Sequence, residues 1–296
     1  MPFVVTLISN PATPAINGDI TTAVKQLMPA STQAKTLHAG VALDLICHDS
    51  MPDSNLLHKI REQLSHAPID CHLQPSEGRR KKLLIADMDS TMIQQECIDE
   101  LAAELGIKEK IAAITESAMR GEIEFEPALK ERVALLKGLA TNIIGQTIEN
   151  RITLTPGGKT LVNTMKQNGA YTALVSGGFT AFTSVIATIL GFHENKANIL
   201  LETDGQLSGE VAMPILGKQA KLQRLNEIMQ EQNLADEETL AVGDGANDLA
   251  MIEAAGLGVA FHAKPAVAAK ADACINHSDL TALLYLQGYT SSEFSQ

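Results

Sequence analysis

The sequence predicts an α/β fold with three parts: a small α/β N-terminal unit, a core built on a parallel sheet, and a helical insertion directly after the first core strand. Three observations lead to this prediction. From residue 156 onward, short apolar runs typical of buried strands alternate with helical segments. The segment 92–154 has helical spacing and no strand pattern. A polar, basic stretch at 74–82 separates the first 80 residues from the rest.

Composition narrows the class of protein before any motif is considered. The 296 residues are 45% hydrophobic and 20% charged, which is typical of a globular protein with one large or two modest domains. A net charge of −12 and an aromatic content of 3% argue against a nucleic-acid-binding surface. No segment resembles a membrane span or an export signal, and the four cysteines lack metal-site spacing. We expect a cytoplasmic protein with reduced thiols and with neither nucleic-acid nor membrane partners.

The first 78 residues are expected to form the small α/β unit. Strands are predicted around 4–8, 41–47 and 69–73, and helices over 20–27 and 55–64. The stretch that follows contains four consecutive basic residues between apolar segments, which is typical of a linker. We therefore divide the chain into 1–78 and 79–296.

The second domain shows its elements in order. Residues 83–86 form a short apolar run, typical of a buried strand, and Ile98, Leu101 and Leu105 then recur at helical spacing, as do Val133, Leu136 and Leu139. Further strands are predicted at 170–175, 239–242 and 257–260. Helices are predicted over 180–190, where Gly191 ends the helix, and over 218–230. Asp204-Gly205 between apolar runs predicts a β-hairpin.

Polar clusters follow three of the predicted core strands, and in open parallel sheets ligands bind at these carboxyl ends. A lone acidic pair or a lone Ser-Gly-Gly more often caps a helix or forms a turn. Three such clusters at one edge of a sheet instead indicate a functional site. The clusters are Asp87-Met-Asp89-Ser-Thr91, Ser176-Gly-Gly178 and Gly243-Asp-Gly-Ala-Asn-Asp248.

These residue types suit phosphate chemistry. Clustered oxygen ligands without nearby histidine or thiol groups favour Mg²⁺, which also binds substrate phosphate. A hydroxyl, glycine N–H groups and one lysine form a compact phosphate cradle, with Lys221 as the candidate lysine and Lys218 as its rival. A carboxylate that attacks phosphorus divides the transfer into two steps. A second Asp, two residues on, is placed to act as general acid and then as general base.

The four ordered motifs resemble those of the haloacid dehalogenase (HAD) superfamily, and the second Asp of the first motif points to its phosphatases. Within the superfamily the chain is most similar to the phosphoserine phosphatase family. This resemblance covers roughly residues 81–285, and the first 80 residues loosely resemble an ACT-like domain. Residues that support the closer resemblance are Glu96, Phe125, Arg132, Val175-Ser-Gly-Gly-Phe179 and Ala263-Lys-Pro265.

The resemblance implies a role for each matching residue in a Rossmann-like HAD core. Asp87 is the implied nucleophile and Mg²⁺ ligand, and Asp89 the acid/base, with its backbone carbonyl on Mg²⁺. Asp244 is the other metal ligand. The segment 92–154 is the implied cap, from which Glu96 meets a substrate ammonium and Arg132 a carboxylate. The remaining implied residues are Ser176, Gly177, Lys221 and Asn247 for substrate binding, with Asp248 and Phe125 in support.

The implied activity is Mg²⁺-dependent hydrolysis of O-phospho-L-serine through an aspartyl-phosphate, the last step of serine biosynthesis, by an enzyme expected to be a homodimer. Two alternatives stay open at this stage: the same chemistry on another small phosphomonoester, such as phosphohomoserine, and an inactive regulatory protein. Without the family pattern, Glu96 and Arg132 are more typical of solvated helix faces, and Phe125 of a core. Cys97 is expected to be a buried small residue.

Overall fold

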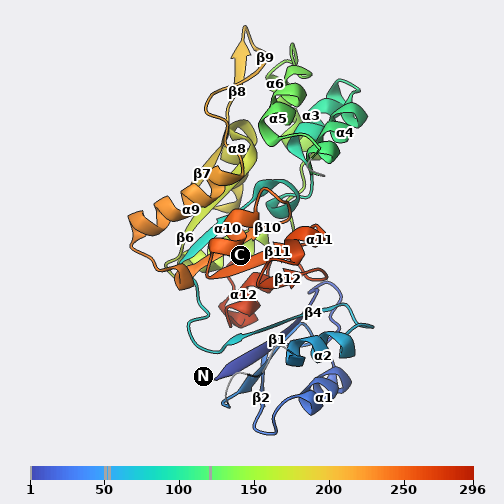
Figure 1. Ribbon diagram of the computed structural model, residues 1–296, viewed down its shortest axis with the longest axis vertical. Coiled ribbons are helices and arrows are strands. Elements are labelled where there is room, and N and C mark those ends of the chain that lie inside the picture. Colours follow the sequence, from blue (N-terminus) through green and yellow to red (C-terminus); the bar gives the residue numbers. More distant parts are fainter. Residues whose placement is uncertain (1, 50–51, 53–54, 120–121) are drawn as a thin grey trace.

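The computed structural model describes residues 2–49, 52, 55–119 and 122–296. Figure 1 shows an N-terminal domain in blue, a central sheet with its helices and, at the far end of the long axis, the helices of the insertion beside a β-hairpin. The predicted α/β fold with a parallel sheet and a helical insertion is confirmed.

The N-terminal domain is a four-stranded antiparallel sheet with two helices on one face. Its elements are β1 (Phe3–Ser9), α1 (Gly18–Leu27), β2 (Gln33–His38), β3 (Ala42–Cys47), α2 (Asn55–Gln63) and β4 (Ile69–Pro75), and the strand order is β2-β3-β1-β4. Alternate residues of β1 point to the helices, where Phe3, Val5 and Leu7 join a buried cluster with Val24 and Ile60. Strand β2 was not predicted from the sequence, because it is an edge strand with a single buried residue.

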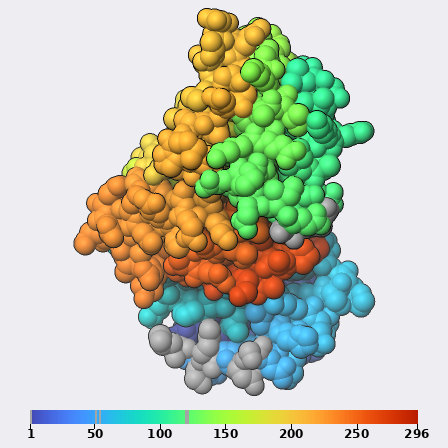
Figure 2. Space-filling view, turned by 45° about the horizontal axis from the view of Figure 1, so that its top comes forward, coloured from blue at the N-terminus to red at the C-terminus, as the bar shows by residue number. Residues whose placement is uncertain are grey.

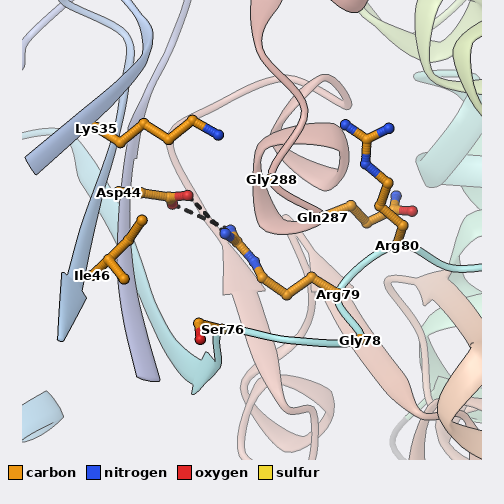
Figure 3. A pocket seen from close by; sticks show the side chains of 9 residues that line it. All are labelled: Lys35, Asp44, Ile46, Ser76, Gly78, Arg79, Arg80, Gln287 and Gly288. Atoms are coloured by element: carbon orange, nitrogen blue, oxygen red, sulfur yellow. Dashed lines mark hydrogen bonds and ion pairs between the residues drawn. The ribbon is translucent and has the colours of Figure 1, made fainter. Parts of the chain in front are cut away.

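Two basic residues of the stretch after β4, Arg79 and Lys81, are buried, which corrects its interpretation as a plain linker. Arg79 is buried, and its guanidinium contacts Asp44 of β3 at 2.7 Å. The same guanidinium donates to the backbone oxygens of Tyr285 and Leu286 in the C-terminal region. Figure 3 shows Arg79 reaching Asp44 along an interdomain cavity of about 430 Å³. The linker therefore fixes the two domains to each other.

The central sheet contains six parallel strands in the order β12-β11-β10-β5-β6-β7. Its strands are β5 (Leu83–Ala86), β6 (Tyr171–Phe179), β7 (Glu194–Asn198), β10 (Thr239–Gly243), β11 (Leu257–Phe261) and β12 (Ala273–Ile275). Strand β5 is buried on both faces of the sheet, because helices cover both. Its residues Leu84 and Ala86 face one apolar cluster, and Leu83 and Ile85 face another. Residues of α7 (Gly158–Gln167), α8 (Thr180–Leu190) and α12 (Ala282–Leu286) pack in the first cluster. Residues of α9 (Lys218–Gln232) and α10 (Leu249–Ala254) pack in the second.

The insertion after β5 forms a helical cap, made of α3 (Cys97–Glu104), α4 (Lys108–Met119), α5 (Phe125–Ala134) and α6 (Asn142–Arg151). The two chain segments that connect it to the core pair with each other, through a bridge between Ile93 and Leu154 and a bond from the Gln94 N–H to the Thr153 oxygen. The predicted helical spacing through Leu139 is partly wrong. Helix α5 ends at Ala134, and the chain then turns at Gly138, whose φ is +84°. The Gly138 N–H donates to the backbone oxygen of Leu207 in the hairpin.

A β-hairpin, β8 (Leu200–Thr203) and β9 (Gln206–Val211), stands beside the cap. Its turn is Asp204-Gly205, as predicted, with φ values of +52° and +76°. The hairpin approaches the end of α5 closely, since a Cβ at Gly209 would lie 3.4 Å from Ala134 Cα and 2.9 Å from the Cβ of Lys137 in the turn that follows the helix. Figure 2 shows the cap, in green, packed against this golden hairpin over the red part of the core.

Among the described residues, none of the helices is long and apolar enough to cross a membrane.

Candidate active site

The predicted site residues converge because their strands are neighbours. β10, β5 and β6 lie side by side and parallel in the centre of the sheet, so their carboxyl ends share one edge. Asp87 follows β5, Ser176 lies near the end of β6, and Asp244 follows β10. All three side chains are buried. The sheet thus brings together the three polar clusters on which the sequence interpretation depends.

Lys221 joins this edge from the second turn of α9. Its Nζ lies 2.6 Å from Asp87 Oδ1 and 2.5 Å from Asp248 Oδ1, and the side chain is 2% exposed. Burial alone would lower the pKa of Lys221, but the carboxylates of Asp248 and Asp87 outweigh burial and raise it. The lysine therefore stays protonated. Its rival from the sequence, Lys218, is exposed at the start of the same helix.

Three carboxylates at this edge are arranged to hold a metal ion. Oxygens of Asp87, Asp244 and Asp248 all lie within 4.8 Å of one another. Asp248 is oriented by Lys221 and by the N–H groups of Asp244 and Gly245. In the described part of the chain, the Asp244 carboxylate forms no ion pair, and burial, together with the charges of Asp87 and Asp248, raises its pKa to about 8. A bound cation would remove this cost, so the donor set fits a hard metal ion.

Gly243 lets these carboxylates approach the strand end. A Cβ at Gly243 would lie 2.3 Å from Asp248 Cγ, so any larger residue would displace Asp248. Asn247, the residue before Asp248, is partly buried. A Cβ at Gly245 would lie only 2.3 Å from its side-chain amide oxygen. The glycines of this motif are therefore explained by close approach.

Asp89 lies apart from the carboxylate cluster and faces the cap and residue Ser176 of β6. Its Oδ1 accepts the Cys97 N–H at 2.9 Å, and its Oδ2 accepts the Ser176 hydroxyl at 3.3 Å. Burial, and next the charge of Asp87, raise the pKa of Asp89 to about 6. Its carboxyl is thus placed to hold a proton near the nucleophile candidate. Burial raises the pKa of the Cys97 thiol well above its usual value, as expected for an inert buried residue.

Neither cap candidate is a solvated residue of a helix face, so that interpretation is wrong: Glu96 is half-buried directly before α3, and Arg132 is buried in α5. Glu96 Oε1 accepts the Ser90 hydroxyl at 2.7 Å, and burial, together with the charge of Asp89, raises the pKa of Glu96 to about 8. Arg132 is 7% exposed, and its Nη1 donates to Thr115 Oγ1 at 3.0 Å. Thr115, which orients the guanidinium, was not predicted from the sequence.

Phe125 connects the cap to the core. It is the first residue of α5, and a Cβ at Gly177 or at Gly217 would lie 3.3 or 3.4 Å from its ring. Gly177 lies in β6, near its carboxyl end, and Gly217 caps the N-terminus of α9. The ring therefore rests on two glycines that flank the candidate phosphate site.

Comparison with known proteins identifies the class to which this fold and site belong. The model of the haloacid dehalogenase-like hydrolases matches residues 84–253, a region that begins in β5 and contains every core candidate of the site. The chain belongs to the haloacid dehalogenase-like hydrolases.

Individual relatives of the chain within this family are phosphoserine phosphatases. Over 224 residues the chain is 46% identical to a probable phosphoserine phosphatase of Schizosaccharomyces pombe, covering 74% of this chain and 75% of that protein. The matches span only 52–66% of three further phosphoserine phosphatases.

Among solved structures, a HAD family hydrolase of Salmonella enterica superimposes with a TM-score of 0.85 at 31% identity, covering 96% of this chain and 98% of that one. A phospho-aspartyl intermediate analogue of phosphoserine phosphatase superimposes with a TM-score of 0.66 at 42% identity, covering 70% of this chain and 98% of the other.

Proposed function

We propose that this protein is a phosphoserine phosphatase, which hydrolyses O-phospho-L-serine to L-serine and phosphate in the last step of serine biosynthesis. One observation carries the proposal: the carboxyl pair at the end of β5 and the cap residues Glu96 and Arg132 lie near one another, since the charge of Asp89 acts on the pKa of both cap residues. The first pair suits phosphoryl transfer, and the second suits the ammonium and carboxylate of an amino acid. The relatives named above support the substrate.

In the first half-reaction, a carboxylate oxygen of Asp87 attacks phosphorus, and the bond from phosphorus to the serine oxygen breaks. Asp89 gives its proton to that oxygen, so serine leaves as a neutral alcohol. The product on the enzyme is an aspartyl-phosphate at Asp87. Lys221, which contacts Asp87 at 2.6 Å, together with the Ser176 hydroxyl and the Gly177 N–H, would stabilise the transferring phosphoryl group.

In the second half-reaction, water attacks the phosphorus of the aspartyl-phosphate. Asp89, now a carboxylate, takes a proton from this water, and the bond to Asp87 breaks to release phosphate and restore the Asp87 carboxylate. Closure of the cap, with Phe125 on Gly177 and Gly217, would exclude other water during the transfer.

The acidic cluster fits Mg²⁺ as the cofactor. Asp87, Asp244 and the backbone carbonyl of Asp89 are the proposed ligands, while Asp248, already bonded to Lys221 and two N–H groups, orients the others. When bound, Mg²⁺ neutralises charge on the phosphoryl oxygens during transfer. The few protein ligands leave positions for water and phosphate, as Mg²⁺ prefers.

Substrate identity would be set by the cap. Glu96, held by Ser90, would bind the ammonium group, and Arg132, held by Thr115, the carboxylate. Asn247, at the edge of the site, would contact the bound phosphoserine. A longer phosphomonoester such as phosphohomoserine would separate phosphate from the ammonium and carboxylate by a further carbon, so a fixed distance between Asp87 and the cap pair disfavours it.

Phosphate release from O-phospho-L-serine by the full chain tests the function directly. We expect turnover with Mg²⁺, none with excess chelator, and inhibition by Ca²⁺, whose longer bonds and larger coordination number would draw both Asp87 oxygens onto the metal. A panel containing phosphohomoserine and an aryl phosphate tests selectivity. If phosphoserine is hydrolysed no faster than the aryl phosphate, the amino-acid assignment is wrong.

Further parts of the proposal concern assembly and location. We propose that the chain divides between residues 78 and 79 and that the N-terminal domain is ACT-like. The β-α-β-β-α-β order of residues 3–75, which is that of a ferredoxin-like unit, supports this division. A homodimer, expected from the resemblance, is testable by light scattering of the purified chain. The four cysteines are free, which suits the reducing cytoplasm.

A further inference from the structure

Asn198 connects two chain segments of the active site without belonging to either. It is the last residue of β7 and is 2% exposed. Its Nδ2 donates to the backbone oxygens of Gly177 at 2.9 Å and Leu216 at 3.2 Å, and its Oδ1 accepts the Leu216 N–H at 2.7 Å. A buried amide with three backbone partners is held in a single orientation.

The two segments carry the groups proposed to bind the phosphoryl group. Gly177 directly follows Ser176 near the carboxyl end of β6, and Leu216 precedes Gly217, the N-cap of the helix that carries Lys221. Among the described residues, no backbone hydrogen bond joins 176–178 to 215–217. The Asn198 amide therefore takes the place of the missing backbone link.

The same connection positions the cap. The Phe125 ring contacts Gly177 on one segment and Gly217 on the other. A change in the separation of these glycines would therefore alter both the phosphate cradle and the surface on which the cap closes. Phosphate binding and closure of the cap thus both depend on the distance between Gly177 and Gly217.

We infer that Asn198 is a positioning residue for phosphoryl transfer, which fixes the separation of the Gly177 amide from Lys221. This inference rests on the proposed phosphatase function. Asn198 acts on the phosphoryl cradle and does not contact the amino-acid part of the substrate. Its loss should therefore affect every phosphomonoester alike, unlike the loss of a cap residue that recognises serine.

The test compares Asn198→Ala and Asn198→Asp with Asn195→Ala in the full-length protein. Asn195 is a matched control, because it lies on the same strand and its amide oxygen accepts the Thr183 hydroxyl at 2.7 Å, away from both segments. We measure kcat and KM on phosphoserine and on an aryl phosphate, inhibition by orthophosphate, and the melting temperature. Asn198→Ser, which keeps one donor, replaces Asn198→Ala if the latter is unfolded at the assay temperature.

For Asn198→Ala we expect kcat/KM to fall about tenfold to 100-fold on both esters, since a misplacement near 1 Å is enough for such a loss. Inhibition by orthophosphate should weaken in parallel. Asn198→Asp should lose more, because a carboxylate oxygen would then face the oxygens of Gly177 and Leu216. Asn195→Ala should stay within about threefold of wild type, which the loss of one ordinary hydrogen bond permits.

A loss confined to phosphoserine, unchanged orthophosphate inhibition, or an equal loss in Asn195→Ala would overturn the inference. Failure of the proposed function looks different. In that case the wild-type protein hydrolyses the aryl phosphate but not phosphoserine, and the effect of Asn198 on the aryl phosphate and on orthophosphate is still measured.

Discussion

Replacing Arg79 by methionine should destabilise the whole chain, although Arg79 lies in the segment between two domains. Its guanidinium contacts Asp44 at 2.7 and 3.2 Å and Thr6 at 3.0 Å, and it also donates to the oxygens of Tyr285 and Leu286. Methionine fills much of the same volume but leaves Asp44, 1% exposed, as an unpaired buried charge.

The expected loss follows from that burial. Removing one partner of a buried ion pair costs about 3–5 kcal/mol in the free energy of unfolding. The neighbouring Arg80 is a matched control: its pair with Glu293 is exposed, at 48% and 38%, and its guanidinium lies 4.0 Å from the centroid of the Tyr289 ring. Such an exposed pair contributes about 0–1 kcal/mol and the ring contact about 0.5–1 kcal/mol. Arg80→Met should therefore cost clearly less.

Urea unfolding at neutral pH, followed by circular dichroism, measures both variants. Adding Asp44→Asn to Arg79→Met should restore part of the loss, since a neutral amide removes the buried charge and still accepts the Thr6 hydroxyl. If Arg79→Met and Arg80→Met shift the unfolding midpoint equally, or if Asp44→Asn restores nothing, Arg79 does not hold the domains together by neutralising Asp44.

Three further predictions concern catalysis, selectivity and pH. Asp87→Asn should abolish phosphate release without lowering the melting temperature, since an amide cannot supply the attacking oxygen; turnover within about tenfold of wild type would exclude Asp87 as nucleophile. Arg132→Ala should reduce kcat/KM on phosphoserine about 10–150-fold more than on an aryl phosphate, and equal losses would contradict the carboxylate contact. Burial, with Arg61 and Arg79, lowers the pKa of His72 from 6.5 to about 4. Between pH 6.5 and about 4, His72 binds a proton in the unfolded chain but not in the folded one. The free energy of unfolding should therefore fall by roughly 3 kcal/mol as the pH drops through this range. His72→Gln should flatten that slope in urea titrations; an unchanged slope would remove His72 as its source.

The core candidates could be predicted from the sequence because their signals are local. Asp87 and Asp244 each follow an apolar run buried on both faces, and a parallel sheet places such strand ends at one edge. The helix 180–190, ended by Gly191, was likewise predicted correctly because its apolar periodicity and its terminal glycine agree.

Other features could not be predicted, because their partners are distant in the sequence. Strand β7 is mostly polar, so nothing local indicates that its last residue, Asn198, is buried between the end of β6 and the segment before α9. Thr115 is one polar residue in an ordinary helix until α5 brings Arg132 beside it. In the sequence, Arg79 is typical of a solvated linker, because its partner Asp44 is 35 residues away, in β3 of the N-terminal sheet.

The paired segments below the cap restrict how the cap can move. Ile93 and Leu154 are bridged, and bonds from Gln94 to Thr153 and from Thr155 to Met92 join the two segments into one ribbon. These bonds keep the two segments from sliding past each other. A second connection holds the cap from the side, since the Gly138 and Thr141 N–H groups donate to the backbone oxygens of Leu207 and Gly205 in the hairpin. The cap is therefore held at two places, so any opening that admits a substrate has to carry the hairpin with it or break these bonds.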